Sequence, residues 1–288
     1  MIVLAFADEA APAGRLAAAL GATLGVIQLH DFPDGEVLPR VEAASPRAVI
    51  YRSLDRPNEK IIPLLLAADA ARRAGAERLE LVCPYLCYLR QDTVFTPGEP
   101  LSRDVVLPLL GRAFDRVLTV DAHLHRTADL STVMGVSAES LSAAPVLAAA
   151  LGGGDAPLVV APDSEARPWA DGIAKSLGGD LLVLEKRRDA ARRVTFAGAE
   201  LGAARGRRAV IVDDVASSGS TLVAVAGMLR EAGAASIEVA VTHALFGEDL
   251  RRRLETVGVR RLVSTDSVVR GEDAAPLAGI LAEALRRT

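Results

Sequence analysis

Aromatic residues, cysteines and long apolar runs are all scarce in this 288-residue sequence. Phe, Trp and Tyr together make up 3% of it, so the core must be built from Ala, Val, Leu and Ile. The two cysteines, Cys83 and Cys87, lie in one apolar stretch and are expected to be buried, reduced thiols. A bridge or a metal pair is less favoured, because no second Cys/His pair stands at the spacing of a four-ligand zinc site.

Three other absences narrow the class of protein. The net charge is −4 and no Lys/Arg block tracks a nucleic-acid backbone, so nucleic-acid binding is disfavoured. No apolar segment approaches the ~20 residues that span a bilayer, which argues against a membrane protein. The segment 1–6 is typical of a first strand and not of a basic leader, so no signal peptide is expected. We therefore expect a soluble, cytoplasmic protein.

The sequence repeats itself. Segments 2–5, 24–27, 47–50 and 79–82 return in the same order as 158–161, 181–184, 208–211 and 237–240. Four ordered matches indicate a duplication. Each half alternates short β-branched strands with longer amphipathic helices, the pattern of α/β units on a parallel sheet. Because the glycine-rich segment 151–155 is a natural joint, we expect two similar domains, residues 1–145 and 156–288.

The strongest local signal lies in residues 209–221. An apolar strand ends in Asp213 and Asp214, a loop of small residues follows, and a helix begins near Thr221. Backbone N–H groups at a helix N-terminus form an anion site that small residues leave accessible, and serine hydroxyls add donors. Two carboxylates at the carboxyl end of a parallel strand suit a ribose diol or a Mg-bound sugar. The alternative is a capped turn with surface acids.

This loop is similar to the phosphoribosyl-binding loop of type I phosphoribosyltransferases. Other segments resemble signatures of the phosphoribosyl-pyrophosphate synthetases, or ribose-phosphate pyrophosphokinases, with archaeal-type features: 32–36, 84–92, 96–102, 119–123, 162–163, 186–188 and 241–243. The resemblance implies an α/β fold of two tandem type I phosphoribosyltransferase-like domains, each with a mainly parallel sheet flanked by helices. It also implies a Mg-dependent transfer of the pyrophosphoryl group of ATP to ribose 5-phosphate, which yields phosphoribosyl pyrophosphate and AMP.

The resemblance assigns ATP to the first domain. The implied contacts are Phe32, Asp34, Glu36, Arg90, Gln91, Asp92 and His123. The guanidinium of Arg90 can fork onto phosphate oxygens. In the resembled family, the loop 32–36 reaches the adenine bound by a neighbouring subunit, which implies a homo-oligomer, either a dimer or a hexamer. Taken alone, the acids of that loop would belong to a surface turn.

The resemblance assigns ribose 5-phosphate to the second domain. The implied contacts are Asp213, Asp214, Ser217, Ser218, Gly219, Ser220 and Thr221. Lys186 and Arg188 belong to an implied mobile arm that stabilises charge on the transferred group and excludes water, although such a basic run is usually a solvated face. His123 and Asp163 are the implied Mg ligands. His125 is favoured as an ordinary polar residue, because a transition-metal His-x-His site would need more histidines nearby.

The chain departs from the family pattern in three places. Serines replace the usual residues at 217, 218 and 220, the segment 164–169 replaces a glycine pair, and the C-terminal region is short. Two other functions stay open. A phosphoribosyltransferase that consumes the activated sugar would need only one such domain. A non-catalytic regulatory homologue would typically have a disrupted catalytic arm.

Overall fold

The computed structural model describes residues 1–91, 93–94, 96–124, 129–188, 194–197, 201–269 and 274–287, without the side chains of 186–188 and 194–197. The chain forms two compact units. The first contains residues 1–141, 267–269 and 276–288, and the second contains 142–266 and 270–275. Within the described ranges, no helix is both long enough and apolar enough to cross a membrane.

The first unit is built on a seven-stranded sheet in the order β3-β2-β1-β4-β5-β6-β7. Its strands are β1 (Ile2–Phe6), β2 (Thr23–Asp31), β3 (Val37–Arg40), β4 (Arg47–Tyr51), β5 (Arg78–Val82), β6 (Arg116–Val120) and β7 (Ser137–Leu141). Its helices are a 3-10 turn (Ala7–Glu9), α1 (Ala10–Leu20), α2 (Pro57–Arg73), α3 (Ser102–Gly111), α4 (Leu130–Met134) and α9 (Ala278–Arg286). All neighbouring strands are parallel except β2 and β3, which form an antiparallel hairpin.

The second unit is built on a five-stranded parallel sheet in the order β14-β13-β12-β8-β9. Its strands are β8 (Leu158–Ala161), β9 (Asp180–Val183), β12 (Arg208–Ala216), β13 (Ser236–Ala244) and β14 (Val259–Ser264), and a separate hairpin holds β10 (Glu185–Arg188) and β11 (Val194–Ala197). Its helices are α5 (Ala144–Leu151), α6 (Arg167–Leu177), a 3-10 turn (Leu201–Ala204), α7 (Ser220–Glu231) and α8 (Glu248–Thr256).

The two sheets share one strand order. The repeated sequence segments form β1, β2, β4 and β5 in the first unit and β8, β9, β12 and β13 in the second. The order β2-β1-β4-β5-β6 corresponds to β9-β8-β12-β13-β14. The expected α/β fold with two duplicated, mainly parallel sheets is therefore confirmed. The first sheet is wider, since β3 and β7 extend its edges.

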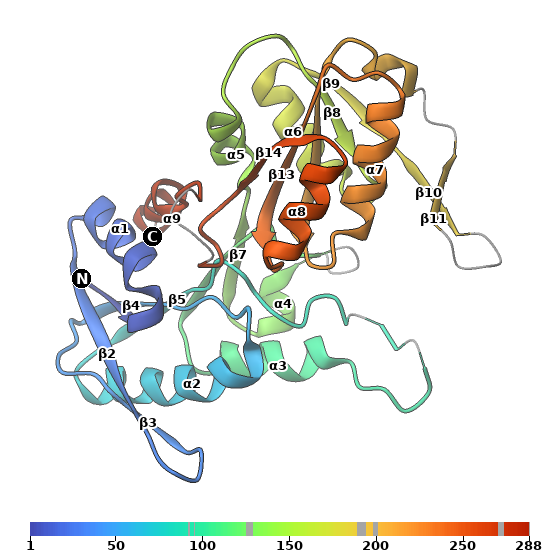
Figure 1. Cartoon of the computed structure of the whole chain (residues 1–288). Coiled ribbons are helices and arrows are strands. Elements are labelled where there is room, and N and C mark those ends of the chain that lie inside the picture. The colour runs from blue at the N-terminus through green and yellow to red at the C-terminus, as the bar shows by residue number, and fades with distance from the viewer. Residues whose placement is uncertain are drawn as a thin grey trace. The chain divides into compact units, whose positions relative to one another are not determined.

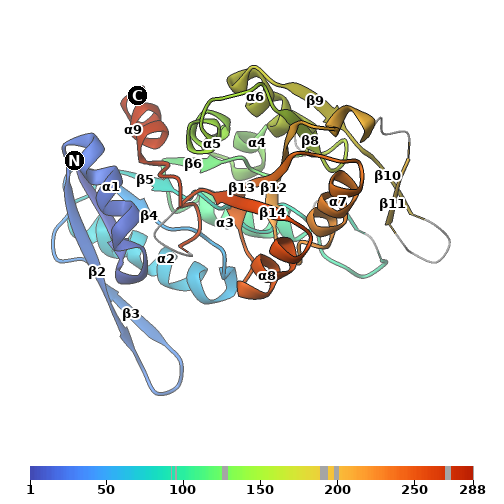
Figure 2. The same cartoon turned by 45° about the horizontal axis from the view of Figure 1, so that its top comes forward.

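Helices cover both faces of each sheet. Parallel crossovers are right-handed, so crossovers that run in opposite directions along a sheet place their helices on opposite faces. In the first unit α1 and α9 lie on one face and α2 and α3 on the other (Figures 1 and 2). In the second unit α5 and α6 lie opposite α7 and α8. The central strands are consequently buried, and β1, β4 and β8 consist almost entirely of apolar residues.

Both cysteines lie in the core of the first unit. Cys83 and Cys87 are free and buried, as the apolar stretch around them predicts. Burial raises the pKa of the Cys87 thiol to about 12, and it raises the pKa of Cys83 as well. Neither thiol is therefore a reactive thiolate at neutral pH.

The two units differ from the domain boundaries expected at 1–145 and 156–288. Helix α5, which precedes the glycine-rich joint, lies in the second unit, and helix α9 at the end of the chain lies in the first. Each helix packs beside the helix that connects the first two strands of its sheet, α9 on α1 and α5 on α6. The first unit is thus completed by the C-terminal segment.

Equivalent residues anchor these two helices. Arg47, Glu80 and Arg116 of β4, β5 and β6 recur as Arg208, Glu238 and Arg261 of β12, β13 and β14. Arg47 Nη2 donates to the carbonyl oxygen of Leu285 in α9 at 2.7 Å. Arg208 Nη2 donates to the carbonyl oxygen of Leu151 in α5 at 2.9 Å. In both units a cation thus satisfies carbonyl groups at a helix C-terminus, where the helix dipole also favours it.

Glu80 and Glu238 pair with the arginines that bind these two helices, so the same ion pair can be compared in the two units. The Glu80 side chain is fully buried (0% exposed) and pairs with Arg47 at 2.8 Å and Arg78 at 3.1 Å, whereas that of Glu238 is 15% exposed and pairs with Arg208 at 2.9 Å. We expect Glu80→Ala to lower the free energy of unfolding by about 2 kcal/mol and Glu238→Ala by about 1 kcal/mol. Urea unfolding measures both, and a larger effect for Glu238→Ala would contradict this account.

Candidate functional site

Most residues singled out by the sequence lie where parallel strands end. Segment 83–91 follows β5, His123 follows β6, Asp163 follows β8, and Asp213 and Asp214 lie near the end of β12. Open α/β sheets bind ligands at the carboxyl ends of their strands. In each unit these candidate residues therefore lie at the edge of the sheet where open α/β folds generally bind ligands. The role of each residue stays a prediction.

Phe32, Asp34 and Glu36 lie at the tip of the β2–β3 hairpin, which projects from the body of the first unit (Figure 1). The N–H of Phe32 donates to the carbonyl oxygen of Glu36 at 2.8 Å, and the N–H of Glu36 donates to the Asp34 carboxylate at 3.1 Å. Gly35 closes the turn with φ +90°, a conformation that favours glycine. The tip is exposed and ordered by its own hydrogen bonds, so it is suited to contact a ligand or another chain.

The segment 83–91, called the nucleotide segment after its predicted ligand, is held from both sides by the neighbouring strands. The N–H of Leu54, just after β4, donates to the carbonyl oxygen of Tyr85 at 2.9 Å. The N–H of Val120 in β6 donates to the carbonyl oxygen of Pro84 at 3.2 Å. The start of the segment is therefore fixed by backbone contacts, which sets the direction in which the rest of it leaves the sheet.

Tyr88 adopts a backbone conformation that is rare for a bulky residue. Its φ is +61°, in the left-handed region where strain is often associated with function. Its hydroxyl donates to Asn58 on the first turn of α2 at 2.5 Å. Arg90 and Gln91 follow and are exposed, whereas Asp92 lies outside the described residues.

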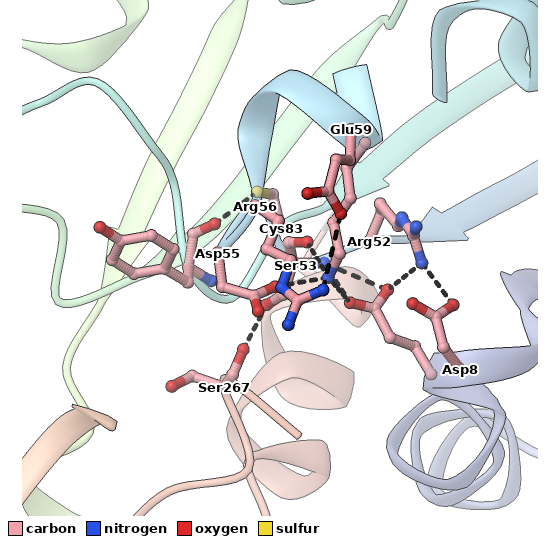
Figure 3. A network of polar contacts seen from close by, with 11 residues as sticks. Asp8, Arg52, Ser53, Asp55, Arg56, Glu59, Cys83 and Ser267 are labelled. Carbon is pink, nitrogen blue, oxygen red and sulfur yellow. Dashed lines mark hydrogen bonds and ion pairs between the residues drawn. The ribbon is translucent and has the colours of Figure 1, made fainter. Parts of the chain in front are cut away.

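Ser53 links this segment to a buried group of charges at the start of α2 (Figure 3). Its hydroxyl accepts from the N–H of Tyr85 at 3.1 Å and donates to the carbonyl oxygen of Ser267. Its N–H donates to the Glu9 carboxylate at 3.2 Å. Glu9 is 2% exposed and accepts from Lys60 Nζ at 3.0 Å. A buried ion pair therefore lies directly behind the nucleotide segment.

The charges of this cluster are paired in the interior. Lys60 Nζ also donates to Asp55 and to the carbonyl oxygen of Ser53 at 3.0 Å. Arg52 Nη1 lies 3.4 Å from Glu9. Burial raises the pKa of Glu9, while the positive charges of Lys60 and Arg52 oppose that rise. Glu9 depends on these two cations to stay ionised out of water. No local sequence pattern indicates this cluster, because Glu9 and Lys60 are 51 residues apart.

His123 is half-buried and lies two residues after another unusual backbone position. Asp121 has φ +38°, and its N–H donates to the carbonyl oxygen of Leu141 at the end of β7 at 2.8 Å. The backbone that leads to His123 is thus constrained by the adjacent strand. His125 lies outside the described residues.

The segment 217–219, called the sugar loop after its predicted ligand, joins β12 to α7 in the second unit. Its last residue, Gly219, has φ +65° and precedes the first helical residue, Ser220. The first N–H groups of α7 have no acceptor within the helix, and the helix dipole adds to their attraction for an anion. Hydroxyl groups around this end are carried by Ser217, Ser218, Ser220 and Thr221. The loop therefore has the geometry of a phosphate site.

Asp213 and Asp214 stand beside this loop. The Asp214 carboxylate accepts from the N–H of Val215 at 2.8 Å, and that of Asp213 accepts from the N–H of Asp214 at 3.0 Å. Burial raises the pKa of Asp213 well above its ordinary range, and the negative charges of Asp214 and Asp163 add to the rise. A bound divalent cation or a hydroxyl-rich sugar would relieve this mutual repulsion.

The carboxylates of the second unit suit a Mg²⁺ ion whose remaining ligands come from water and from the substrate. Asp163 already accepts the N–H groups of Glu165 at 3.0 Å and Ala166 at 3.1 Å, which closes the turn before α6. Among the residues that the structure describes, no group of three or more His, Cys, Asp or Glu side chains is arranged to hold a metal. Mg²⁺ is usually bound by one or two carboxylates together with water and substrate phosphates, which Asp163, Asp213 and Asp214 can provide.

Two residues of α8 contact the sugar loop, and no sequence motif marks either of them. A Cβ atom on Gly219 would lie 2.2 Å from Leu250 Cδ1, so Leu250 packs on the bare glycine backbone. Arg253 Nη1 donates to the carbonyl oxygen of Ser218 at 3.0 Å. The sequence shows only three consecutive arginines on a helix, which do not reveal which of them reaches the loop.

The predicted catalytic arm is a β-hairpin. Lys186 and Arg188 lie on β10 and pair with Phe196 and Val194 of β11. The hairpin follows β9 and projects from the second unit (Figure 1). The side chains of Lys186 and Arg188 lie outside the described parts of the chain, so their catalytic role stays a prediction.

Known families match both units. Residues 1–113 match the model of the N-terminal domain of ribose phosphate pyrophosphokinase, and residues 143–260 match that of the phosphoribosyl transferase domain. The first match covers β1 to α3, and the second contains the sugar loop and the β10–β11 hairpin.

Relatives match over nearly the whole chain. The ribose-phosphate pyrophosphokinase of Methanopyrus kandleri is 35% identical over 290 residues, which cover 99% of this chain and 98% of the relative. That of Thermococcus kodakarensis is 36% identical over 86% of this chain and 88% of the relative. The crystal structure of phosphoribosylpyrophosphate synthetase from Mycobacterium smegmatis matches with a TM-score of 0.82 at 26% identity, over 99% and 97% of the two chains. Since the two family models match both units and the relatives match over nearly their full length, the chain belongs to the ribose-phosphate pyrophosphokinase family.

Proposed function

We propose that this chain transfers the pyrophosphoryl group of ATP to the anomeric hydroxyl of ribose 5-phosphate, giving phosphoribosyl pyrophosphate and AMP. The observation that carries the proposal is the loop at residues 217–221 beside Asp213 and Asp214. The N-terminus of α7 supplies donors for the sugar phosphate, and the adjacent carboxylates supply acceptors for the ribose hydroxyls. One turn of the chain thus offers both kinds of contact that a sugar phosphate needs.

The first unit is proposed to bind ATP. Arg90 and Gln91 are exposed at the end of a segment fixed by its neighbours, where a guanidinium can fork onto phosphate oxygens. Asp92 and His123 belong to the same proposed site. Phe32, Asp34 and Glu36 at the hairpin tip are proposed to contact the adenine held by another subunit of a homo-oligomer, a dimer or a hexamer.

Charge stabilisation is proposed to supply most of the catalysis. Mg²⁺ would neutralise the polyphosphate when it is bound, and the proposed ligands are His123 in the first unit and Asp163 in the second. Lys186 and Arg188 stabilise the charge that develops on the transferred group. Closure of their hairpin would exclude water, which competes with the sugar hydroxyl as the nucleophile.

The sugar site is tested by the double variant Asp213→Asn, Asp214→Asn. We expect its affinity for ribose 5-phosphate, measured by calorimetry, to fall by about tenfold or more, because both acceptors of the sugar hydroxyls lose their charge. ATP affinity should change little. Asp180→Asn, an acid of the same unit with a 73% exposed side chain, is the control. Unchanged sugar affinity in the double variant would remove these residues from the site.

A further inference from the structure

One peptide group in the sugar loop would either attract or repel a bound anion, depending on the direction in which it points. It joins Ser218 to Gly219, directly before α7. The C=O and N–H of a trans peptide point in opposite directions, so only one of them can face a bound phosphate. An N–H donor would attract the phosphate, whereas a carbonyl oxygen would repel it.

Helix α8 sets the direction of this peptide. Arg253 Nη1 donates to the carbonyl oxygen of Ser218 at 3.0 Å, so the oxygen is held on the side of α8 and the N–H of Gly219 faces away from it. Leu250, one turn earlier on α8, is 3% exposed and packs where a side chain on Gly219 would lie. The φ of +65° at Gly219 is accessible to glycine at no steric cost.

The hydrogen bond to the Ser218 carbonyl oxygen is shorter than the contact that the Arg253 side chain makes with a carboxylate. The nearest carboxylate partner, Asp249 on the same helix, lies at 3.9 Å, and the Arg253 side chain is 41% exposed. Arg252, the preceding residue, is also exposed and carries the same charge. Arg252 and Arg253 are thus adjacent residues of like charge, and of the two Arg253 donates to the loop carbonyl.

We propose that Arg253 is a positioning residue for ribose 5-phosphate, because it holds the Ser218 carbonyl towards α8 and thereby directs the Gly219 N–H into the phosphate site. The proposal rests on the proposed function of the loop 217–221. Without Arg253 the peptide can rotate, and its carbonyl oxygen then competes with the N–H for the side that faces the phosphate. Arg253 acts through the loop and does not itself contact the substrate.

The test compares Arg253→Ala with Arg252→Ala in steady-state kinetics, with ribose 5-phosphate and ATP varied in turn. We expect Arg253→Ala to raise the KM for ribose 5-phosphate about tenfold, the effect of one charge-assisted hydrogen bond, while the KM for ATP stays within about twofold. Arg252→Ala removes the same charge and should leave both KM values close to those of the unaltered protein. Arg253→Lys, which retains the charge without the planar fork, should show a raised KM for the sugar phosphate as well.

Trp169 fluorescence checks that the second unit of each variant is folded, since this single tryptophan lies on α6. If the KM for ribose 5-phosphate is the same in Arg253→Ala and Arg252→Ala, the positioning role of Arg253 is overturned. The change in KM would then reflect only the loss of one positive charge. If Arg253→Ala does not fold, the same comparison is made with Arg253→Lys. Failure of the unaltered protein to bind ribose 5-phosphate in calorimetry would instead overturn the proposed function itself.

Discussion

Replacing Lys60 with methionine is expected to lower the free energy of unfolding by about 3–5 kcal/mol, because it leaves the carboxylate of Glu9 buried without its partner. Glu9 is 2% exposed and Lys60 is 8% exposed, and their charged atoms lie 3.0 Å apart. Urea unfolding followed by far-UV circular dichroism measures the change. Trp169 on α6 reports the second unit separately, so unfolding of the first unit should appear as an early loss of dichroism that the Trp169 fluorescence does not follow.

Two controls separate the buried pair from a general effect of charge. Lys175→Met breaks an exposed pair with Asp171 on α6, where the lysine side chain is 75% exposed, and should change the stability by less than about 0.5 kcal/mol. The double variant Glu9→Gln, Lys60→Met removes both charges and should recover much of the loss. A double variant as unstable as Lys60→Met alone would contradict the account.

The free energy of unfolding of Lys60→Met should also depend on pH more strongly than that of the unaltered protein. The pKa of Glu9 is already raised by burial, and Lys60 is the largest influence that lowers it. Without Lys60 the pKa in the folded protein rises further above its ordinary value of 4.5. A raised pKa of Glu9 in the folded protein adds stability at pH values below its ordinary pKa. This added stability is lost as the pH rises through the raised pKa. Lys60→Met should therefore lose stability towards neutral pH more steeply than the unaltered protein.

Replacing Lys186 with alanine is expected to slow AMP release from Mg-ATP by about a thousandfold, the usual effect of removing a cation that stabilises a transferring phosphoryl group. ATP affinity should change much less, because the proposed contact strengthens as charge develops on the group. Lys175→Ala, an exposed lysine of the same unit, is the matched control. A variant whose rate stays within about tenfold of the unaltered protein would remove Lys186 from the catalytic group.

The duplicated fold was predictable because its signal is periodic and local. The matched segments 2–5 and 158–161 are apolar runs that become buried parallel strands, β1 and β8, with corresponding neighbours in both sheets. Partners distant in the sequence were not predictable. Helix α9 has an apolar face that the sequence reveals, but nothing in it says that this face packs on α1 in the first unit.

The position of the candidate site was predictable from the sequence, but the residues that hold its segments in place were not. The strand ending in Asp213 and Asp214, followed by small residues and a helix start, has a local signature, and the structure has that order. Glu9 and Lys60 are 51 residues apart, and charged residues are usually exposed, so no local pattern reveals a buried pair. Arg253 is indistinguishable from Arg252 until the helix is placed against the loop.

Pyrophosphoryl transfer is tested by AMP release from Mg-ATP, measured on the unaltered protein with and without ribose 5-phosphate. We expect release that depends on the sugar phosphate, with phosphoribosyl pyrophosphate formed in equal amount. A folded protein that binds both substrates and releases no AMP would show that the chain does not catalyse this transfer, and would indicate instead a non-catalytic member of the family that acts on other subunits.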